Sequence, residues 1–210
     1  MTEGARLRVG VLASGRGSNF ESIAAAAAAG RIPAEVVLLL SDRREVGALE
    51  IARAHGIAAE VVEPRDHPGR EAHDKALVDH LESRRVRLVC LAGYMRILGP
   101  AFVGHFRGRL LNVHPSLLPA FPGLHPQRQA LEHGVAVAGA TVHFVDEGTD
   151  TGPIVLQAAV PVLPDDTEET LSARILAAEH RIYPEAIRLF AERRLRLEGR
   201  RVRILEEGPA

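Results

Sequence analysis

The sequence predicts an α/β protein with a Rossmann-like, mostly parallel twisted sheet, helices on both faces and an antiparallel C-terminal part. Two observations predict this class. Short apolar runs alternate with helical segments from residue 7 to about residue 125, and this order produces parallel strands joined by right-handed crossovers. Two strand-like runs then follow each other without an intervening helix, at 136–145 and 154–162. The sheet is therefore expected to finish antiparallel.

The remaining elements are predicted in chain order from periodicity and from helix and turn signals. Earlier strands are expected at 7–13, 35–40, 58–62, 87–92 and 109–113. Shorter helices are expected at 20–29, 46–54, 70–83, 100–106 and 127–132. A long helix follows at 167–192, capped by Thr167 with acidic residues in its first turn. The charged, alternating segment 195–205 is expected to be one edge strand.

These elements suggest one domain over 1–192 and a C-terminal extension over 193–210. Within the domain we distinguish a nucleotide-binding-like half, 1–125, from a C-terminal half, 126–192. A chain of 210 residues with 46% hydrophobic residues is long and apolar enough to bury a sizeable core.

Charge and cysteine content narrow the function class. Lys and Arg number 26 against 27 Asp and Glu, so the basic surplus typical of proteins that bind nucleic acid or acidic membranes is absent. The single cysteine, Cys90, belongs to no CxxC pattern. The N-terminus lacks a signal-peptide core, and no apolar run approaches the roughly 20 residues of a membrane span. We expect a cytoplasmic protein.

The turn Ser14-Gly15-Arg16-Gly17-Ser18-Asn19 links the first strand to the first helix. Glycines at such a turn let the backbone approach a phosphate, and the amides that begin the helix point at the anion. Phe20 replaces the third glycine of GxGxxG, but Asp42 follows the second strand, so a dinucleotide site stays open. A mononucleotide phosphate site is favoured, with Arg70 as a further anion-binding candidate.

Asn112, His114 and Asp150 are the candidates for chemistry. Asn112 and His114 are two apart at the end of a strand, so they share a face. An amide, an imidazole and a carboxylate suit attack on a carbonyl, because they stabilise an oxyanion and move protons. Asp150 is expected to orient the imidazole or to raise its pKa. The alternative is that these residues only form turns.

The sequence gives less support to two other kinds of site, a serine nucleophile and a metal site. Ser116 lies outside any G-x-S-x-G elbow, so a serine nucleophile is disfavoured. His114, His125, His143 and Asp150 are residue types that bind metals, but no HExxH-like spacing is present. Four prolines between 115 and 126 predict a rigid connection, a preformed wall of the site, or both.

Five motifs resemble the phosphoribosylglycinamide formyltransferase family. They are the turn at 14–19, Ala92-Gly93-Tyr94-Met95-Arg96-Ile97-Leu98, Leu111-Asn112-Val113-His114-Pro115-Ser116-Leu117-Leu118-Pro119, Pro122-Gly123-Leu124-His125 and Asp150-Thr151-Gly152-Pro153. The N-x-H-P-S-L-L-P motif is typical of the wider folate-dependent formyltransferase superfamily. The resemblance runs from Leu7 to about Phe190. It implies formyl transfer from 10-formyltetrahydrofolate to the amine of glycinamide ribonucleotide, in de novo purine synthesis, without a metal.

The resemblance also implies residue roles. Asn112 and His114 would stabilise the oxyanion, with His114 as proton donor and Asp150 keeping it protonated and organising a relay water. Backbone groups of Gly17, Ser18 and Asn19 would hold the ribonucleotide phosphate, and Glu179 would contact the glycinamide end. The folate site would comprise Arg70, Met95, Arg96, Ile97, Leu98 and Asn112.

Three other kinds of protein are alternatives to the glycinamide ribonucleotide enzyme that the motifs resemble. Methionyl-tRNA formyltransferase would carry a further RNA-binding domain and usually an Arg-Gly after Leu118, where this chain has Phe121-Pro122-Gly123. Formyltetrahydrofolate hydrolase shares the three candidate residues but typically has an N-terminal regulatory domain. A non-catalytic nucleotide-binding module would need the phosphate turn but not the trio. The expected partners are the two small-molecule substrates, not nucleic acid or membrane, and the chain is expected to be a monomer or homodimer.

Overall fold

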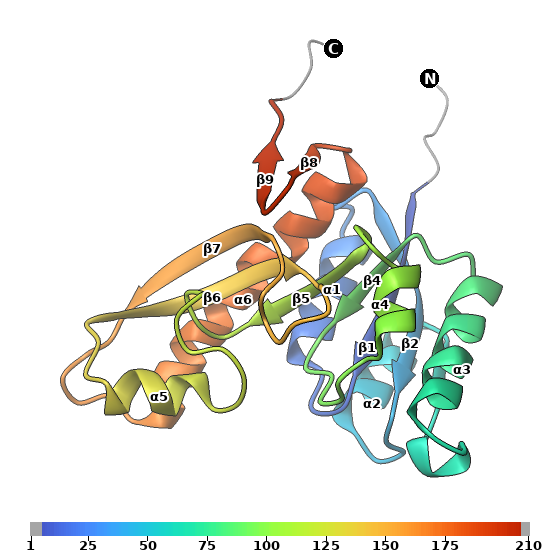
Figure 1. Cartoon of the computed structure of the whole chain (residues 1–210), viewed down its shortest axis with the longest axis horizontal. Coiled ribbons are helices and arrows are strands. Elements are labelled where there is room, and N and C mark those ends of the chain that lie inside the picture. Colours follow the sequence, from blue (N-terminus) through green and yellow to red (C-terminus); the bar gives the residue numbers. More distant parts are fainter. Residues whose placement is uncertain (1–5, 207–210) are drawn as a thin grey trace. The chain divides into compact units, whose positions relative to one another are not determined.

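The computed structural model describes residues 6–206 (Figure 1). The first five residues of the predicted domain and the last four of the predicted extension lie outside the described residues. The chain divides into two compact units, Met1–Leu111 and Asn112–Ala210. This division comes earlier than the half-domain boundary predicted at 125, and the segment after residue 192 belongs to the second unit.

The first unit contains a parallel sheet. Its strands are β1 (Leu7–Ala13), β2 (Ala34–Ser41), β3 (Ala59–Val61), β4 (Leu88–Leu91) and the start of β5 (Leu110–His114). The order is β3-β2-β1-β4-β5, and the β1–β2, β1–β4 and β2–β3 pairs are all parallel. The order reverses at β1, and open α/β sheets bind ligands beyond the carboxyl ends of the strands at such a point.

Four helices and a short 3-10 turn cover this sheet. They are α1 (Ser18–Ala28), α2 (Gly47–Ala54), η1 (Pro64–Asp66), α3 (Arg70–Ser83) and α4 (Pro100–His105). Helix α1 contacts α2 and α3 contacts α4, and Figure 1 shows the two pairs on opposite sides of the strands. The central strands are buried on both faces, which explains their continuous apolar sequence: Val9, Val11 and Leu12 are 0% exposed.

The second unit contains strands of both directions. It holds the end of β5, α5 (Pro126–Glu132), β6 (Val137–Phe144), β7 (Ile154–Pro161), α6 (Glu168–Ala191), β8 (Leu195–Glu198) and β9 (Arg201–Ile204). Strands β6 and β7 are antiparallel, β7 and β9 parallel, and β8 and β9 antiparallel. Helix α6 contacts both β6 and β7. It begins at Glu168, one residue later than predicted, and Thr167 caps it as predicted: the Thr167 side chain accepts a hydrogen bond from the Thr170 amide at 3.2 Å.

The predicted fold class is confirmed, and helix 70–83 matches the structure to the residue. The single strand predicted at 195–205 is wrong. It is a hairpin, because Gly199 adopts φ 63 and, with Arg200, forms a two-residue turn between the paired Glu198 and Arg201.

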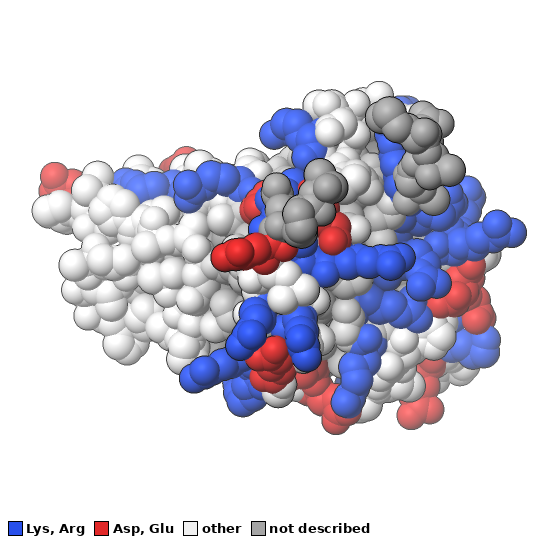
Figure 2. Space-filling model, turned by 90° about the horizontal axis from the view of Figure 1, so that it is seen from above, with Lys and Arg blue, Asp and Glu red and all other residues white. Residues whose placement is uncertain are grey.

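Basic and acidic side chains lie close together over one part of the face seen in Figure 2, and another part of that face carries few charges. Figure 2 shows Lys and Arg side chains intermixed with Asp and Glu on the face viewed. Among the helices of the described residues, none has both the length and the hydropathy needed to cross a membrane.

Candidate active site

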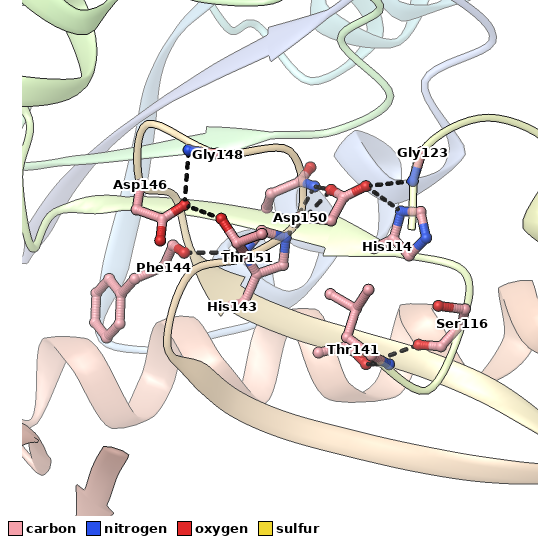
Figure 3. A network of polar contacts seen from close by, with 12 residues as sticks. His114, Ser116, Gly123, Thr141, His143, Phe144, Asp146, Gly148, Asp150 and Thr151 are labelled. Atoms are coloured by element: carbon pink, nitrogen blue, oxygen red, sulfur yellow. Dashed lines mark hydrogen bonds and ion pairs between the residues drawn. The ribbon is translucent and has the colours of Figure 1, made fainter. Parts of the chain in front are cut away.

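The three candidate residues meet in the second unit. Asn112 and His114 come from the end of β5, and Asp150 comes from the loop between β6 and β7. Figure 3 shows Asp150 beside His114. Asp150 Oδ2 lies 3.3 Å from His114 Nδ1, and Asp150 Oδ1 lies 3.5 Å from Asn112 Nδ2. The expectation that Asp150, distant in sequence, folds back beside His114 is therefore confirmed.

His114 is held at both ring nitrogens. Nε2 lies 2.8 Å from the Phe121 carbonyl oxygen, to which it donates, and Nδ1 faces Asp150. Both partners are acceptors, so the protonated ring makes two favourable contacts here and the neutral ring only one.

Burial nevertheless outweighs these contacts. The side chain is 6% exposed. Burial lowers the pKa of His114, while the Phe121 carbonyl and the Asp150 carboxylate oppose the shift and His143 adds to it. Asp150 thus favours the protonated ring, with the sign expected from the sequence, while burial sets the net direction of the pKa shift.

Asp150 is fixed by backbone as well as by side chains. Its own φ is 54, an unusual value for a residue with a Cβ. Oδ2 accepts a hydrogen bond from the Gly123 amide at 2.8 Å. Burial alone would raise the pKa of Asp150, but His143, the Gly123 amide and His114 together hold that pKa below its ordinary value. The carboxylate is therefore ionised at neutral pH.

His143 is a member of this cluster that the sequence reasoning considered only as a metal ligand. It lies on β6 and is 2% exposed. Its Nδ1 is 2.8 Å from the Phe144 carbonyl oxygen, so Nδ1 carries a proton. In the neutral ring Nε2 is then an acceptor, and it lies 3.2 Å from Asn112 Nδ2. The same atom lies 3.6 Å from Asp150 Oδ1, which it faces with a proton only in the protonated ring. His143 thus orients the Asn112 amide.

A signal for His143 was present in the sequence. Thr141 and His143 are polar residues two apart in an otherwise apolar strand, the same spacing that drew attention to Asn112 and His114. Both are buried, at 0% and 2% exposure. Buried polar side chains need partners, and these two have them.

The proline-containing loop that follows His114 is tied down from its inner side. Thr141 Oγ1 donates to the Ser116 carbonyl at 2.7 Å and accepts from the Leu118 amide at 3.0 Å. Gln157 Nε2 donates to the Leu118 carbonyl at 2.8 Å. Ser116 donates its hydroxyl to the Ala120 carbonyl and is 2% exposed, so it is not presented as a nucleophile. The loop supplies a preformed wall.

No group of three or more His, Cys, Asp and Glu within residues 6–206 is arranged to hold a metal ion. In particular, the four residues considered as ligands from the sequence are not grouped in that way.

In the first unit, the turn at 14–19 and the segment at 93–98 meet. The Ser14 amide donates to the Gly93 carbonyl at 3.1 Å, and the Ser14 hydroxyl accepts from the Met95 amide at 2.9 Å. Gly17 precedes α1 with φ 83, so Ser18 and Asn19 open that helix. The start of a helix attracts anions, because its first amides and its dipole point outward there.

Two further features of this region concern the glycine turn and the acidic residue after the second strand. A Cβ on Gly17 would lie 2.7 Å from Ala48 Cα. Glycine is therefore required here for close packing against α2. Asp42, which follows β2, is only 7% exposed.

The candidate folate residues differ in exposure. Met95 and Ile97 are 66% and 76% exposed, which is unusual for large apolar side chains, whereas Leu98 is 9% exposed. Arg96 and Arg70 are exposed, and Arg70 begins α3. Glu179 is 5% exposed on α6 in the second unit. The 93–98 segment thus offers an apolar surface with cations nearby.

With this geometry in place, similarity to known proteins defines the class. The sequence model of the family described as Formyl transferase matches residues 7–187. The chain belongs to the formyl transferase family.

The similar proteins narrow the position within that family. Phosphoribosylglycinamide formyltransferase of Escherichia coli is 45% identical over 191 residues, which are 91% of this chain and 90% of that protein. The solved structure of glycinamide ribonucleotide transformylase 1 from Symbiobacterium toebii superposes with a TM-score of 0.95 at 59% identity, covering 97% of this chain and 96% of that one. The resemblance inferred from the motifs is confirmed.

Some relatives are much longer. The trifunctional purine biosynthetic protein adenosine-3 of Drosophila pseudoobscura pseudoobscura is 52% identical over 193 residues, which are 91% of this chain but 14% of that protein. The chain therefore spans about one seventh of these trifunctional relatives.

Proposed function

We propose that this chain is a phosphoribosylglycinamide formyltransferase: it transfers a formyl group from 10-formyltetrahydrofolate to the amine of glycinamide ribonucleotide in de novo purine synthesis. The observation that carries the proposal is the cluster of Asn112, His114 and Asp150, with the carboxylate 3.3 Å from the imidazole. The full-length similarity to enzymes of that name supports the choice of substrates.

The reaction sets the demands on these residues. A bond forms between the amine nitrogen and the formyl carbon, and the bond from that carbon to the folate nitrogen breaks. The amine loses one proton and the folate nitrogen gains one, so no net proton is consumed. Such a transfer needs orientation, an oxyanion donor and a proton route, and it needs no covalent enzyme intermediate.

Asn112 is the proposed oxyanion donor. Its Nδ2 carries two hydrogens, and His143 Nε2, at 3.2 Å, engages one of them. The 3.5 Å contact to Asp150 is long for a hydrogen bond, so the second hydrogen is available to the formyl oxygen as charge develops there. The same contact to the formyl group makes Asn112 part of the folate site.

His114 is the proposed proton carrier and second oxyanion donor. Its lowered pKa makes the neutral ring the main resting form near pH 7 and the protonated ring a stronger acid. The ring therefore accepts a proton at one stage and returns it at another. Asp150 stabilises the imidazolium that forms between these stages and is proposed to hold the water that relays the proton.

We also propose how the two substrates are bound. Backbone amides of Gly17, Ser18 and Asn19 bind the ribonucleotide phosphate at the start of α1. The exposed apolar residues Met95 and Ile97, with Leu98, pack against the folate, and Arg96 and Arg70 pair with its carboxylates. Glu179 contacts the glycinamide end.

The decisive assay supplies both substrates and follows tetrahydrofolate and formylated product. We expect product from the wild type, and a loss of at least about a hundredfold in kcat for His114→Ala, with ribonucleotide binding retained in a calorimetric titration. Near-normal turnover in that variant would remove His114 from the mechanism. Formate released without the amine acceptor would identify a hydrolase instead.

The remaining assignments belong to the same proposal. The chain acts as one formyltransferase domain over residues 1–192, in the cytoplasm, as a monomer or homodimer. Its partners are the two substrates, not nucleic acid or membrane.

A further inference from the structure

The loop that carries Asp150, residues 146–152, is tightly built. Asp146 Oδ1 accepts from the Thr151 hydroxyl at 2.7 Å and from the Gly148 amide at 3.1 Å (Figure 3). A Cβ on Gly152 would lie 1.7 Å from the Phe144 carbonyl oxygen, so the loop closes directly onto the end of β6.

The backbone of Asp150 itself works against this arrangement. Its φ of 54 lies in the left-handed region, which residues with a Cβ disfavour. Such a conformation persists only where the surroundings hold it in place. The contacts within the loop hold Asp146 to Thr151, and a further contact is made from outside.

That outside contact comes from the C-terminal hairpin. Strand β9 lies beside β7, with Ile154 paired to Arg201. The turn before β9 contains Arg200, whose Nη2 donates to the Thr151 carbonyl at 3.1 Å. Thr151 directly follows Asp150. The hairpin lies beyond the residues that match the family model, 7–187.

Other arginines of the hairpin have different partners. Arg196 and Arg203 both approach Glu198, at 3.5 and 3.6 Å. The base of the hairpin is closed by the Leu205 amide, which donates to the Arg194 carbonyl at 2.8 Å. These contacts join the hairpin to itself, whereas the Arg200 contact joins it to the Asp150 loop.

We propose that Arg200 is a positioning residue for formyl transfer: by holding the Thr151 carbonyl, it keeps the Asp150 carboxylate against His114. The inference rests on the proposed function for its effect on rate. Its structural part, the placement of Asp150, is independent of which reaction the site performs.

The physical reason lies in the chain path. The Thr151 carbonyl is one residue from the Asp150 Cα, so restraining it restricts rotation of the backbone that aims the carboxylate. Asp150 Oδ2 must lie near both His114 Nδ1 and the Gly123 amide, at 3.3 and 2.8 Å. A small rotation loses both contacts, and misplacement of about 1 Å at a reacting centre costs rate rather than affinity.

The test compares Arg200→Ala with the matched control Arg203→Ala, which removes an arginine from the same hairpin without touching the loop. In Arg200→Ala we expect kcat to fall by about three- to tenfold, the range of one hydrogen bond, with KM for each substrate within about twofold. Arg200→Lys retains a donor and should restore most of kcat. Arg203→Ala should resemble the wild type.

A second readout follows His114 by NMR titration in the same proteins. Asp150 opposes the fall in the pKa of His114, so loosening Asp150 should move the titration to lower pH in Arg200→Ala and not in Arg203→Ala. Identical kcat and identical His114 titration in the two variants would overturn the inference, as would a rise in KM at unchanged kcat. If the wild type transfers no formyl group, the proposed function fails, and the titration alone still decides whether Arg200 positions Asp150.

Discussion

His143 illustrates how one buried imidazole sets the direction of another residue. Because its Nδ1 donates to the Phe144 carbonyl, its Nε2 presents a lone pair to the Asn112 amide. That contact turns the amide nitrogen, and not its oxygen, toward the place where negative charge would develop. Without His143 the amide is free to rotate, and the wrong orientation would repel an oxyanion.

We therefore predict that His143→Leu lowers kcat by roughly tenfold. The variant loses the hydrogen bond that orients the Asn112 amide, and with it about 1 to 1.5 kcal/mol of transition-state stabilisation. His143→Gln keeps a side-chain acceptor and should retain more activity than the leucine variant. Steady-state kinetics of the two variants check this. Equal rates for both would mean that His143 acts through packing alone.

Asp150 gives a prediction of a different kind, because it influences the pKa of its neighbour. Asp150→Asn keeps an acceptor for the Gly123 amide but removes the charge that favours protonated His114. We expect kcat to fall by about a hundredfold or more with little change in KM. The limb of the rate profile due to His114 should move to lower pH. A loss confined to KM would assign Asp150 to binding instead.

At the level of residues, the sequence sufficed where a motif or a strand end marked the site. Asn112 and His114 stand at a strand end, and Asp150 stands in a turn, where polar residues attract attention. His143 stands inside a strand, where a histidine is ordinarily a packing residue. The polar alternation of Thr141 and His143 marks the position as unusual, but the role of His143 depends on a neighbour 31 positions away, and one sequence contains no signal for that pairing.

Among the elements, strand β6 does more than pair with β7. Thr141 on β6 holds the loop after His114 through the Ser116 carbonyl and the Leu118 amide. That loop in turn supplies the Phe121 carbonyl to His114 and the Gly123 amide to Asp150. The site is thus positioned by a strand that contributes none of the three candidate residues.

Thr141→Val tests this role of β6. The substitution nearly preserves volume but leaves a buried carbonyl and a buried amide without their partner, which should lower the free energy of unfolding by about 1 to 3 kcal/mol. Urea denaturation gives the value. Thr149→Val, at an exposed position of the β6–β7 loop, is the control and should change stability little. The idea fails if both variants unfold at the same urea concentration.

Helices were easier to predict than the last strands for physical reasons. Helix 70–83 is bounded by Gly69 and a short charged segment, and local signals define its ends. The hairpin at 195–204 alternates in a way that suits one strand or two. Only the left-handed conformation of Gly199 divides this segment into two strands. A glycine in a sequence permits that conformation but does not show that a turn occurs there.

For the whole molecule, two histidines contribute to how stability responds to acid. Burial lowers the pKa of His114 and the pKa of His180 below the ordinary value of 6.5. Between that value and the lower folded value, the unfolded chain binds more protons than the folded one. Stability therefore rises with pH in this window and is lost as pH falls below 6.5 through the folded pKa. Asp150 adds a second loss at lower pH, below its ordinary pKa of 3.8.

We predict that the free energy of unfolding decreases steadily from pH 7.5 to pH 5. A His180→Asn variant should show a shallower decrease over the same range, because one of the two groups no longer titrates. Urea melts at several pH values measure both slopes. A wild-type stability that is flat or rises on acidification would contradict the lowered pKa values.

The thiol of Cys90 allows the rate at which the first unit opens to be measured. It is buried on β4 in the first unit, and it is the only cysteine in the sequence. A thiol reagent added to native protein therefore reacts only when that sheet opens, and every labelled molecule records one such opening. Hydrogen exchange of the β6 amides measures the corresponding opening rate of the second unit. If the opening rates from Cys90 labelling and from β6 amide exchange agree across a range of urea, the two units open cooperatively. If Cys90 is labelled at a higher rate, the first unit opens alone.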